Sequence, residues 1–122
     1  MRKVLKGLHW TIGVCAVAAV ISIDVAVAAT GCVGRVTESY VYANGDVGVR
    51  TDWNANLILL CNIKSEWKGV TPDVCALWVA KADAAVTTQL PLNIRYAEDF
   101  VCEAAPTYAS SFAPTYVRLY SQ

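Results

Sequence analysis

Hydrophobic and polar residues change their spacing several times along the chain, and each change marks a different predicted element. In residues 47–53, Val47 and every second residue after it are apolar or β-branched, while Gly48, Arg50 and Asp52 lie between them. This alternation is typical of a β-strand with one side in water. Residues 57–61 contain no polar side chain, so we expect a short strand that is buried on both faces at the centre of a sheet.

Further strands are predicted on both sides of these two. Residues 36–42 are rich in β-branched and aromatic side chains, and Asn44-Gly45 follows as a strong hairpin signal. After Pro91, residues 92–96 alternate again, and proline is tolerated at the first position of a strand. Residues 116–120 also alternate and could close the sheet as a fifth strand.

A single amphipathic helix is predicted to begin at Pro72. Thr71 offers a hydroxyl N-cap, Pro72 occupies the first helical position, and Asp73 places a carboxylate in the first turn. Apolar residues then recur at helical spacing and define the expected buried face, namely Val74, Leu77, Trp78, Ala82 and Ala85. We expect the helix to end near residues 86–88, where β-branched residues cluster.

Together these elements predict a β-rich α+β domain. Three strands, one helix and then one or two strands is the order found in a small OB-like barrel, with the helix between strands 3 and 4. An open antiparallel sheet of four to five strands with one packed helix has the same order. Both alternatives remain open at this stage.

The N-terminal segment reads as an export signal rather than as part of the domain. Arg2, Lys3 and Lys6 form a basic start, residues 11–23 are almost wholly apolar, and Ala26-Val27-Ala28 offers small residues for a signal peptidase. We therefore expect a secretory signal peptide over residues 1–28 and a single domain over 29–122, with cleavage after Ala28 or, second, after Ala29. An uncleaved membrane anchor and a lipoprotein attached through Cys32 are the alternatives.

Signal removal changes the chemistry of the chain. The only histidine, His9, is lost, together with three of the ten basic and one of the ten acidic residues. Seven positive and nine negative charges remain, a balance that excludes nucleic acid as an expected partner. No membrane association is expected after cleavage, and the protein should be secreted or periplasmic.

Four cysteines remain after cleavage, which in an exported chain indicates two disulfides. Three pairings are compatible with the sequence. We favour Cys61 with Cys75, which joins a strand to the helix, and Cys32 with Cys102, which ties the start of the domain to a late loop. A zinc site is the competing interpretation, but the chain has no C-x-x-C pair and keeps no histidine.

Candidate catalytic groups are few. Without histidine the usual base for a serine or cysteine nucleophile is missing. The only dense acidic cluster, formed by Glu98, Asp99 and Glu103, suits a solvated turn better than a pair of hydrolytic carboxylates. The sequence thus predicts no enzyme, no cofactor and no metal.

Aromatic side chains are plentiful for a domain of this size, and such amphipathic rings are favoured in interfaces and sugar-binding surfaces. Trp53 and Trp78 are expected in the core. The candidate binding residues are those expected on loops and strand surfaces, namely Trp67, Tyr40, Tyr42, Tyr108 and Tyr116. The last two close a repeated Ala-Pro-Thr-Tyr segment at 105–108 and 113–116.

A set of cysteine, tryptophan and proline spacings carries a resemblance. The set comprises Gly45, Leu-Cys-Asn at 60–62, Trp67-Lys68-Gly69-Val70, Cys75 with Trp78, Cys102, and Pro-Thr-Tyr at 106–108 and 114–116. In these positions the chain resembles an uncharacterised family of short exported proteobacterial proteins, which implies no activity. The order of strand cysteine, tryptophan loop, cysteine-bearing helix and following strand is similar to that of the OB-fold B subunits of AB5 toxins, although receptor-site residues are not recognisable.

These observations predict a non-enzymatic binding module that holds a glycan or a protein through exposed aromatic residues. A small envelope hydrolase or hydrolase inhibitor is the alternative from another class. A structural subunit whose function is oligomerisation is the third.

Overall fold

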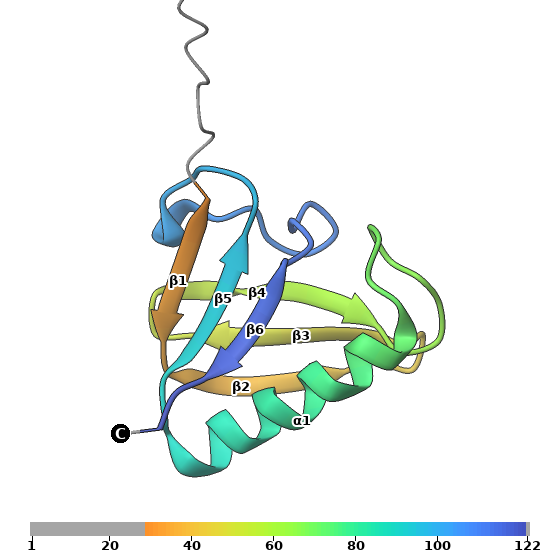
Figure 1. The fold of residues 1–122 in the computed structure, drawn as a ribbon, viewed down its shortest axis with the longest axis horizontal. Helices are drawn as coiled ribbons and strands as arrows, with labels where there is room; N and C mark the ends of the chain where they lie inside the picture. Colours follow the sequence, from red (N-terminus) through yellow and green to blue (C-terminus); the bar gives the residue numbers. More distant parts are fainter. Residues whose placement is uncertain (1–28, 122) are drawn as a thin grey trace, which may run out of the picture.

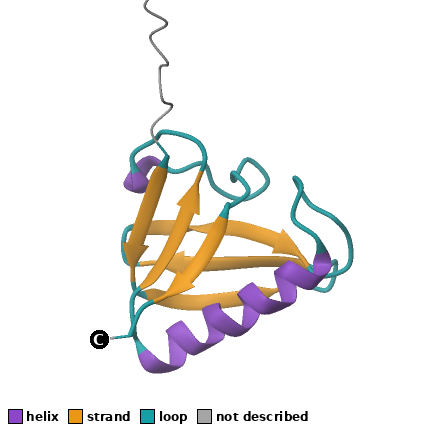
Figure 2. Ribbon diagram, in the orientation of Figure 1, coloured by secondary structure: helices purple, strands orange, loops and turns teal. Residues whose placement is uncertain are grey.

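The computed structural model describes residues 29–121, and the predicted signal peptide lies outside them. The described chain forms six strands, one α-helix and one short 3-10 helix (Figures 1 and 2). In order these are β1 (Thr30–Gly34), β2 (Val36–Val41), β3 (Asp46–Thr51), β4 (Asn54–Asn62), α1 (Pro72–Thr88), β5 (Leu92–Tyr96), η1 (Cys102–Ala104) and β6 (Tyr116–Leu119).

The strands form two antiparallel three-stranded sheets, β1-β5-β6 and β2-β3-β4. Figure 1 shows the first sheet crossing in front of the second at a steep angle, with α1 running beside β2. Side chains from both sheets and from α1 meet in one core, which includes Val36, Val49, Leu60, Trp78, Leu92, Ile94 and Tyr96. The β-rich fold with one helix is therefore confirmed.

The predicted number of strands and the position of the helix were wrong. The structure has six strands rather than four to five, and α1 follows the fourth strand rather than the third. The difference is β1, whose sequence TGCVG is short and contains two glycines, so it lacks the usual strand signal. Its five residues nevertheless pair with β5, and Cys32 within it is bonded to Cys102.

The expectation that residues 57–61 form a central strand was also wrong, because β4 lies at the edge of its sheet. Its two faces are buried for different reasons. Ile58 and Leu60 belong to the shared core, whereas Leu57 and Leu59 are buried but lie outside it. The loop 105–112 covers their side of the strand, since Tyr108 N–H donates to the Leu57 carbonyl and Leu59 N–H donates to Ser111 Oγ. A loop therefore protects an otherwise open edge.

The hairpin between β2 and β3 forms where the Asn-Gly pair predicts it. Tyr42 N–H donates to the Asp46 carbonyl, and Gly45 N–H donates to the Tyr42 carbonyl. Gly45 has a positive φ of 96°, whereas Asn44 does not have a positive φ. The turn is a three-residue loop with glycine at its last position, a common hairpin connection.

The helix begins and ends as predicted, at Pro72 and Thr88. Thr71 has the extended backbone of an N-cap residue, but its hydroxyl makes no capping hydrogen bond. The buried face also differs from the expected one. Trp78 lies in the core as predicted, whereas Leu77 is 67% exposed and Cys75 is fully buried. The bond from Cys75 to Cys61 turns that side of the helix toward β4.

Both disulfides join the cysteines that the sequence favours, Cys32 with Cys102 and Cys61 with Cys75. Two such bonds indicate that the chain folds in an oxidising environment. Because the sulfur of Cys32 is bonded to Cys102, it is not free for lipid attachment. No helix within residues 29–121 is long and apolar enough to cross a membrane.

Candidate functional site

A pocket of about 440 Å³ opens between the β2–β3 hairpin and the loop 105–112, over the outer face of β4. Its walls come from segments far apart in the chain. The lining residues are Tyr42, Ala43, Asn44, Asp46, Leu57, Leu59, Tyr108 and Ala109. The pocket is therefore the place where the hairpin, the edge strand and the C-terminal loop meet.

Two tyrosines and two leucines give the pocket its apolar surface. Tyr42 and Tyr108 are 46% and 51% exposed, which is high for aromatic side chains. Leu57 and Leu59 are buried and form part of the lining beneath them. Gly48 in β3 makes room for this arrangement, because a Cβ there would lie 3.0 Å from Leu57 Cγ.

Tyr108 is held by an unusual backbone and by the edge of β4. Its φ is 53°, a left-handed conformation that non-glycine residues seldom adopt. Its N–H donates to the Leu57 carbonyl at 2.9 Å. Beyond it, Lys68 Nζ donates to the carbonyls of Ala109 and Ser111, which ties the loop 62–70 to this wall of the pocket. Strain at a residue that lines a pocket is a common feature of functional sites.

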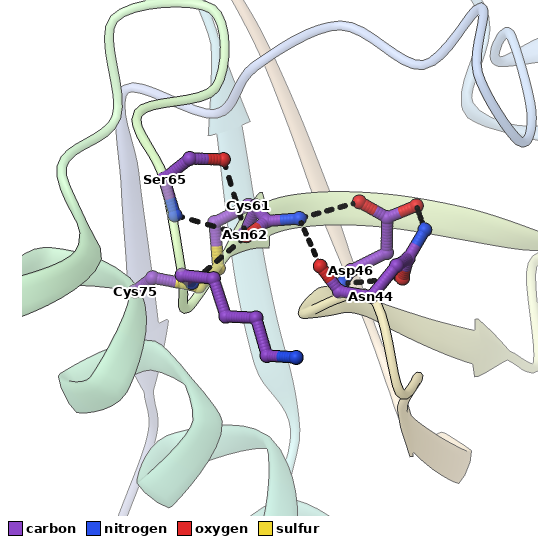
Figure 3. Close-up of a disulfide and its surroundings, with 7 residues drawn as sticks. Asn44, Asp46, Cys61, Asn62, Ser65 and Cys75 are labelled. Atoms are coloured by element: carbon purple, nitrogen blue, oxygen red, sulfur yellow. Dashed lines mark hydrogen bonds between the residues drawn. A yellow bond between two sulfur atoms is a disulfide. The ribbon is translucent and has the colours of Figure 1, made fainter.

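Asn62 fixes the opposite wall, as Figure 3 shows. Its Nδ2 donates to Asp46 Oδ1 at 2.9 Å and to the Asn44 carbonyl at 3.2 Å, while its Oδ1 accepts from the N–H groups of Lys64 and Ser65. Asn44 Nδ2 in turn donates to Asp46 Oδ2 at 3.1 Å. Since Asn62 is only 8% exposed, this network makes the polar rim of the pocket rigid.

The disulfide between β4 and α1 lies directly beside this network (Figure 3). Cys61 precedes Asn62, so the bond to Cys75 anchors the end of β4 at the residue that holds the hairpin. Lys64, two residues later, donates to the Ala43 carbonyl at 2.5 Å. Covalent and hydrogen-bonded ties thus preform the rim.

The structure brings together two of the five candidate binding residues, Tyr42 and Tyr108, in this pocket. Tyr40 adjoins it, because its ring stacks on Tyr42 with centroids 6.1 Å apart. Its hydroxyl donates to Glu38, and this hydrogen bond raises the pKa of Tyr40 above its ordinary value. Arg50 lies over the same ring and pairs with Glu38.

The other two candidates lie elsewhere. Trp67 is half-buried in a tight turn closed by reciprocal hydrogen bonds with Val70, and Lys68 Nζ lies 4.7 Å from its ring centroid. Tyr116 is 44% exposed at the start of β6, opposite Arg95 in the β1-β5-β6 sheet. The two repeats of Ala-Pro-Thr-Tyr therefore take different roles: one tyrosine lines the pocket and the other begins a strand.

Sequence reasoning missed six of the eight lining residues, two of which are alanines. Asn44 and Asp46 were interpreted first as turn residues, which they also are. Leu57 and Leu59 were assigned to the core, because an apolar run does not show which of its faces meets the other sheet. Because successive side chains of a strand point to opposite faces, Leu57 and Leu59 lie on the other face of β4 from Ile58 and Leu60. This alternation was the one sequence signal that could have identified them as lining residues.

The acidic cluster at 98–103 does not contribute to the pocket. Asp99 and Glu103 are exposed, while Glu98 is partly buried and its Oε2 has no hydrogen-bond partner. Within residues 29–121 no three His, Cys, Asp or Glu side chains are grouped so that they could hold a metal ion. The pocket can supply apolar stacking and hydrogen bonding to a ligand.

Comparisons with protein-family models, with curated proteins and with solved structures find no match to this chain. They neither support nor oppose the resemblance to the exported family or to the toxin B subunits, which stays a prediction.

Proposed function

We propose that the chain is a secreted or periplasmic, non-enzymatic binding module whose pocket holds a glycan. The observation that carries this proposal is the pairing of Tyr42 and Tyr108 around a preformed pocket with an amide and a carboxylate on its rim.

The chemistry of the lining favours a neutral sugar. A pyranose ring has apolar C–H faces and hydroxyl edges, and the exposed tyrosines match the faces. Asn44 and Asp46 match the edges as hydrogen-bonding groups. Asp46 is the one charged side chain among the lining residues, and Lys64 and Lys68 donate to backbone carbonyls of the lining, so the charges around the pocket do not favour a charged ligand of either sign.

The two disulfides support export, because such bonds persist in oxidising compartments. We further propose that the two sheets form an OB-like barrel. Only Arg35 separates β1 from β2, so the chain passes from one sheet to the other within a single residue, and α1 packs against strands of both sheets.

The test is a neutral glycan array followed by titration of the best ligand into protein recovered from the producing cells. Tyr42→Ala and Tyr108→Ala should each weaken binding by about tenfold or more, as expected for an anchoring aromatic side chain. Tyr116→Ala is the matched control, because its exposure is similar and it lies outside the pocket. It should leave the affinity unchanged.

Two results would oppose the glycan proposal. One is the absence of binding to every neutral glycan, and the other is an equal loss of affinity in all three variants. Capture of a protein whose binding depends on Tyr42 and Tyr108 would replace the glycan with a protein partner at the same pocket.

A further inference from the structure

A second exposed surface, unrelated to the pocket, lies on the outer face of the β1-β5-β6 sheet, which Figure 1 views from the front. The strand register arranges its side chains in two rows, Gly31–Arg95–Tyr116 and Val33–Asn93–Arg118. The row between them, Cys32–Ile94–Val117, points the other way and is buried in the core. We call the outward surface the arginine–tyrosine face, made of Arg95, Tyr116, Arg118 and Tyr120.

Two positive charges lie next to each other on this face. Arg95 is directly opposite Tyr116, and Arg118 is two residues farther along β6, so the two arginines are diagonal neighbours. Among the described residues the one ion pair joins Arg50 to Glu38, so neither arginine has a carboxylate partner. Residues 29–122 carry seven basic and nine acidic side chains, so two adjacent arginines without an acidic partner form a local excess of positive charge on a domain that is negative overall.

A neighbouring ring orients the guanidinium group of Arg118, and a glycine makes room for that of Arg95. Arg118 lies over the ring of Tyr120, 4.6 Å from its centroid, and Asn93 Nδ2 donates to the Tyr120 hydroxyl at 3.2 Å. Arg95 lies above Gly31, where a Cβ would come within 3.2 Å of Arg95 Nη1. The absence of a side chain at Gly31 thus lets the Arg95 guanidinium lie close to the sheet.

An unsatisfied acceptor completes the face. Asn93 is only 6% exposed, and its Oδ1 has no hydrogen-bond partner. A Cβ placed on Gly31 would lie 3.2 Å from this oxygen and also 3.2 Å from Arg95 Nη1. The oxygen and the guanidinium group therefore lie on either side of the same small space above Gly31. An acceptor without a partner favours a ligand that brings hydroxyl donors, and the two guanidinium groups favour a ligand with a negative charge.

We propose that the arginine–tyrosine face binds a carboxylate-bearing glycan, such as a polymer of uronic acid. Guanidinium groups bind carboxylates through two parallel hydrogen bonds, and the exposed ring of Tyr116 offers a stacking surface for a sugar. This site does not depend on the pocket proposed above.

The experiment is a calorimetric titration of polygalacturonate into the purified protein at low salt, with neutral dextran as the second ligand. Arg95→Gln with Arg118→Gln should weaken polygalacturonate binding by roughly tenfold or more. Arg50→Gln with Lys81→Gln removes the same charge from β3 of the other sheet and from the exposed side of α1, and it should change binding by less than about threefold, as expected for charges outside this face that are screened by solvent. Tyr116→Ala should also weaken binding.

Three outcomes would overturn the proposal: no binding of polygalacturonate, equal losses in the two double variants, or tighter binding of inorganic polyphosphate than of polygalacturonate. Tyr42→Ala and Tyr108→Ala separate the two sites, since they should leave polygalacturonate binding intact. Circular dichroism of each variant verifies that it is folded.

Discussion

Replacing Gly45 by alanine should destabilise the protein far more than the same change at Gly69. Both glycines have positive φ, 96° at Gly45 and 85° at Gly69, so each substitution places a Cβ in a left-handed conformation. That strain costs about 1–2 kcal/mol. The two sites differ in their surroundings, since nothing lies within 4 Å of a Cβ on Gly69.

At Gly45 the new Cβ would lie 2.6 Å from Asn62 Oδ1 and 2.9 Å from Lys64 Cγ. Asn62 must then move, although its Oδ1 accepts from the N–H groups of Lys64 and Ser65. Each of these hydrogen bonds contributes about 1 kcal/mol net. The total cost at Gly45 is therefore about 3–4 kcal/mol, against about 1–2 kcal/mol at Gly69.

Urea unfolding of the disulfide-intact protein, followed by tryptophan fluorescence, measures both free energies of unfolding. Gly45→Ala should also weaken ligand binding at the pocket, because Asn62 holds Asp46 and the Asn44 backbone. Equal losses of stability at the two glycines would refute the reasoning, because they would show that the left-handed backbone accounts for the whole cost and the contact with Asn62 for none of it. Unchanged ligand affinity in a folded Gly45→Ala variant would show that Asn62 does not position the rim.

Three further predictions concern the core and the covalent ties. In the chain-entropy model, removal of the disulfide that spans 70 residues should cost about 4 kcal/mol and removal of the one that spans 14 about 3 kcal/mol, so the denaturation midpoint should fall further for the first. Trp78→Ala should cost about 3–5 kcal/mol and Leu77→Ala less than about 0.5 kcal/mol in the same unfolding assay; similar losses would contradict the observed helix face. Burial of Tyr96, and then the charge of Glu98, raises the pKa of the Tyr96 hydroxyl in the folded protein. The unfolded chain therefore loses this proton first, at about pH 10, and the free energy of unfolding should fall as the pH rises above that value. When unfolding is measured from pH 8 to 11, Tyr96→Phe should show a smaller fall in the free energy of unfolding than the unmodified protein.

Elements with strong local signals were predictable from the sequence. The helix follows from Thr71-Pro72-Asp73 at its start, and the hairpin follows from Asn44-Gly45. The alternation in β3 identifies its core face, since Val47 and Val49 are buried as expected. In each case a few neighbouring residues decide the backbone conformation, so no knowledge of distant contacts is needed.

Other features depend on contacts between distant parts of the chain. β1 has little strand propensity of its own and is specified by its pairing with β5 and by the bond from Cys32 to Cys102. The buried side of α1 is decided by the bond between Cys61 and Cys75, which overrides the apolar character of Leu77. Tertiary contacts outweigh local pattern wherever the local preference is weak.

The pocket shows why the site was only partly predictable. Tyr42 and Tyr108 were identified as exposed aromatic residues, but nothing in their local sequence shows that they line the same pocket. They do so because the edge of β4 needs hydrogen-bond partners, and the loop 105–112 supplies them through Tyr108 N–H and Ser111 Oγ. The hydrogen bonds that cover the edge of β4 also place Tyr108 in the wall of the pocket that Tyr42 lines. The stability of this edge and the geometry of the pocket therefore depend on each other.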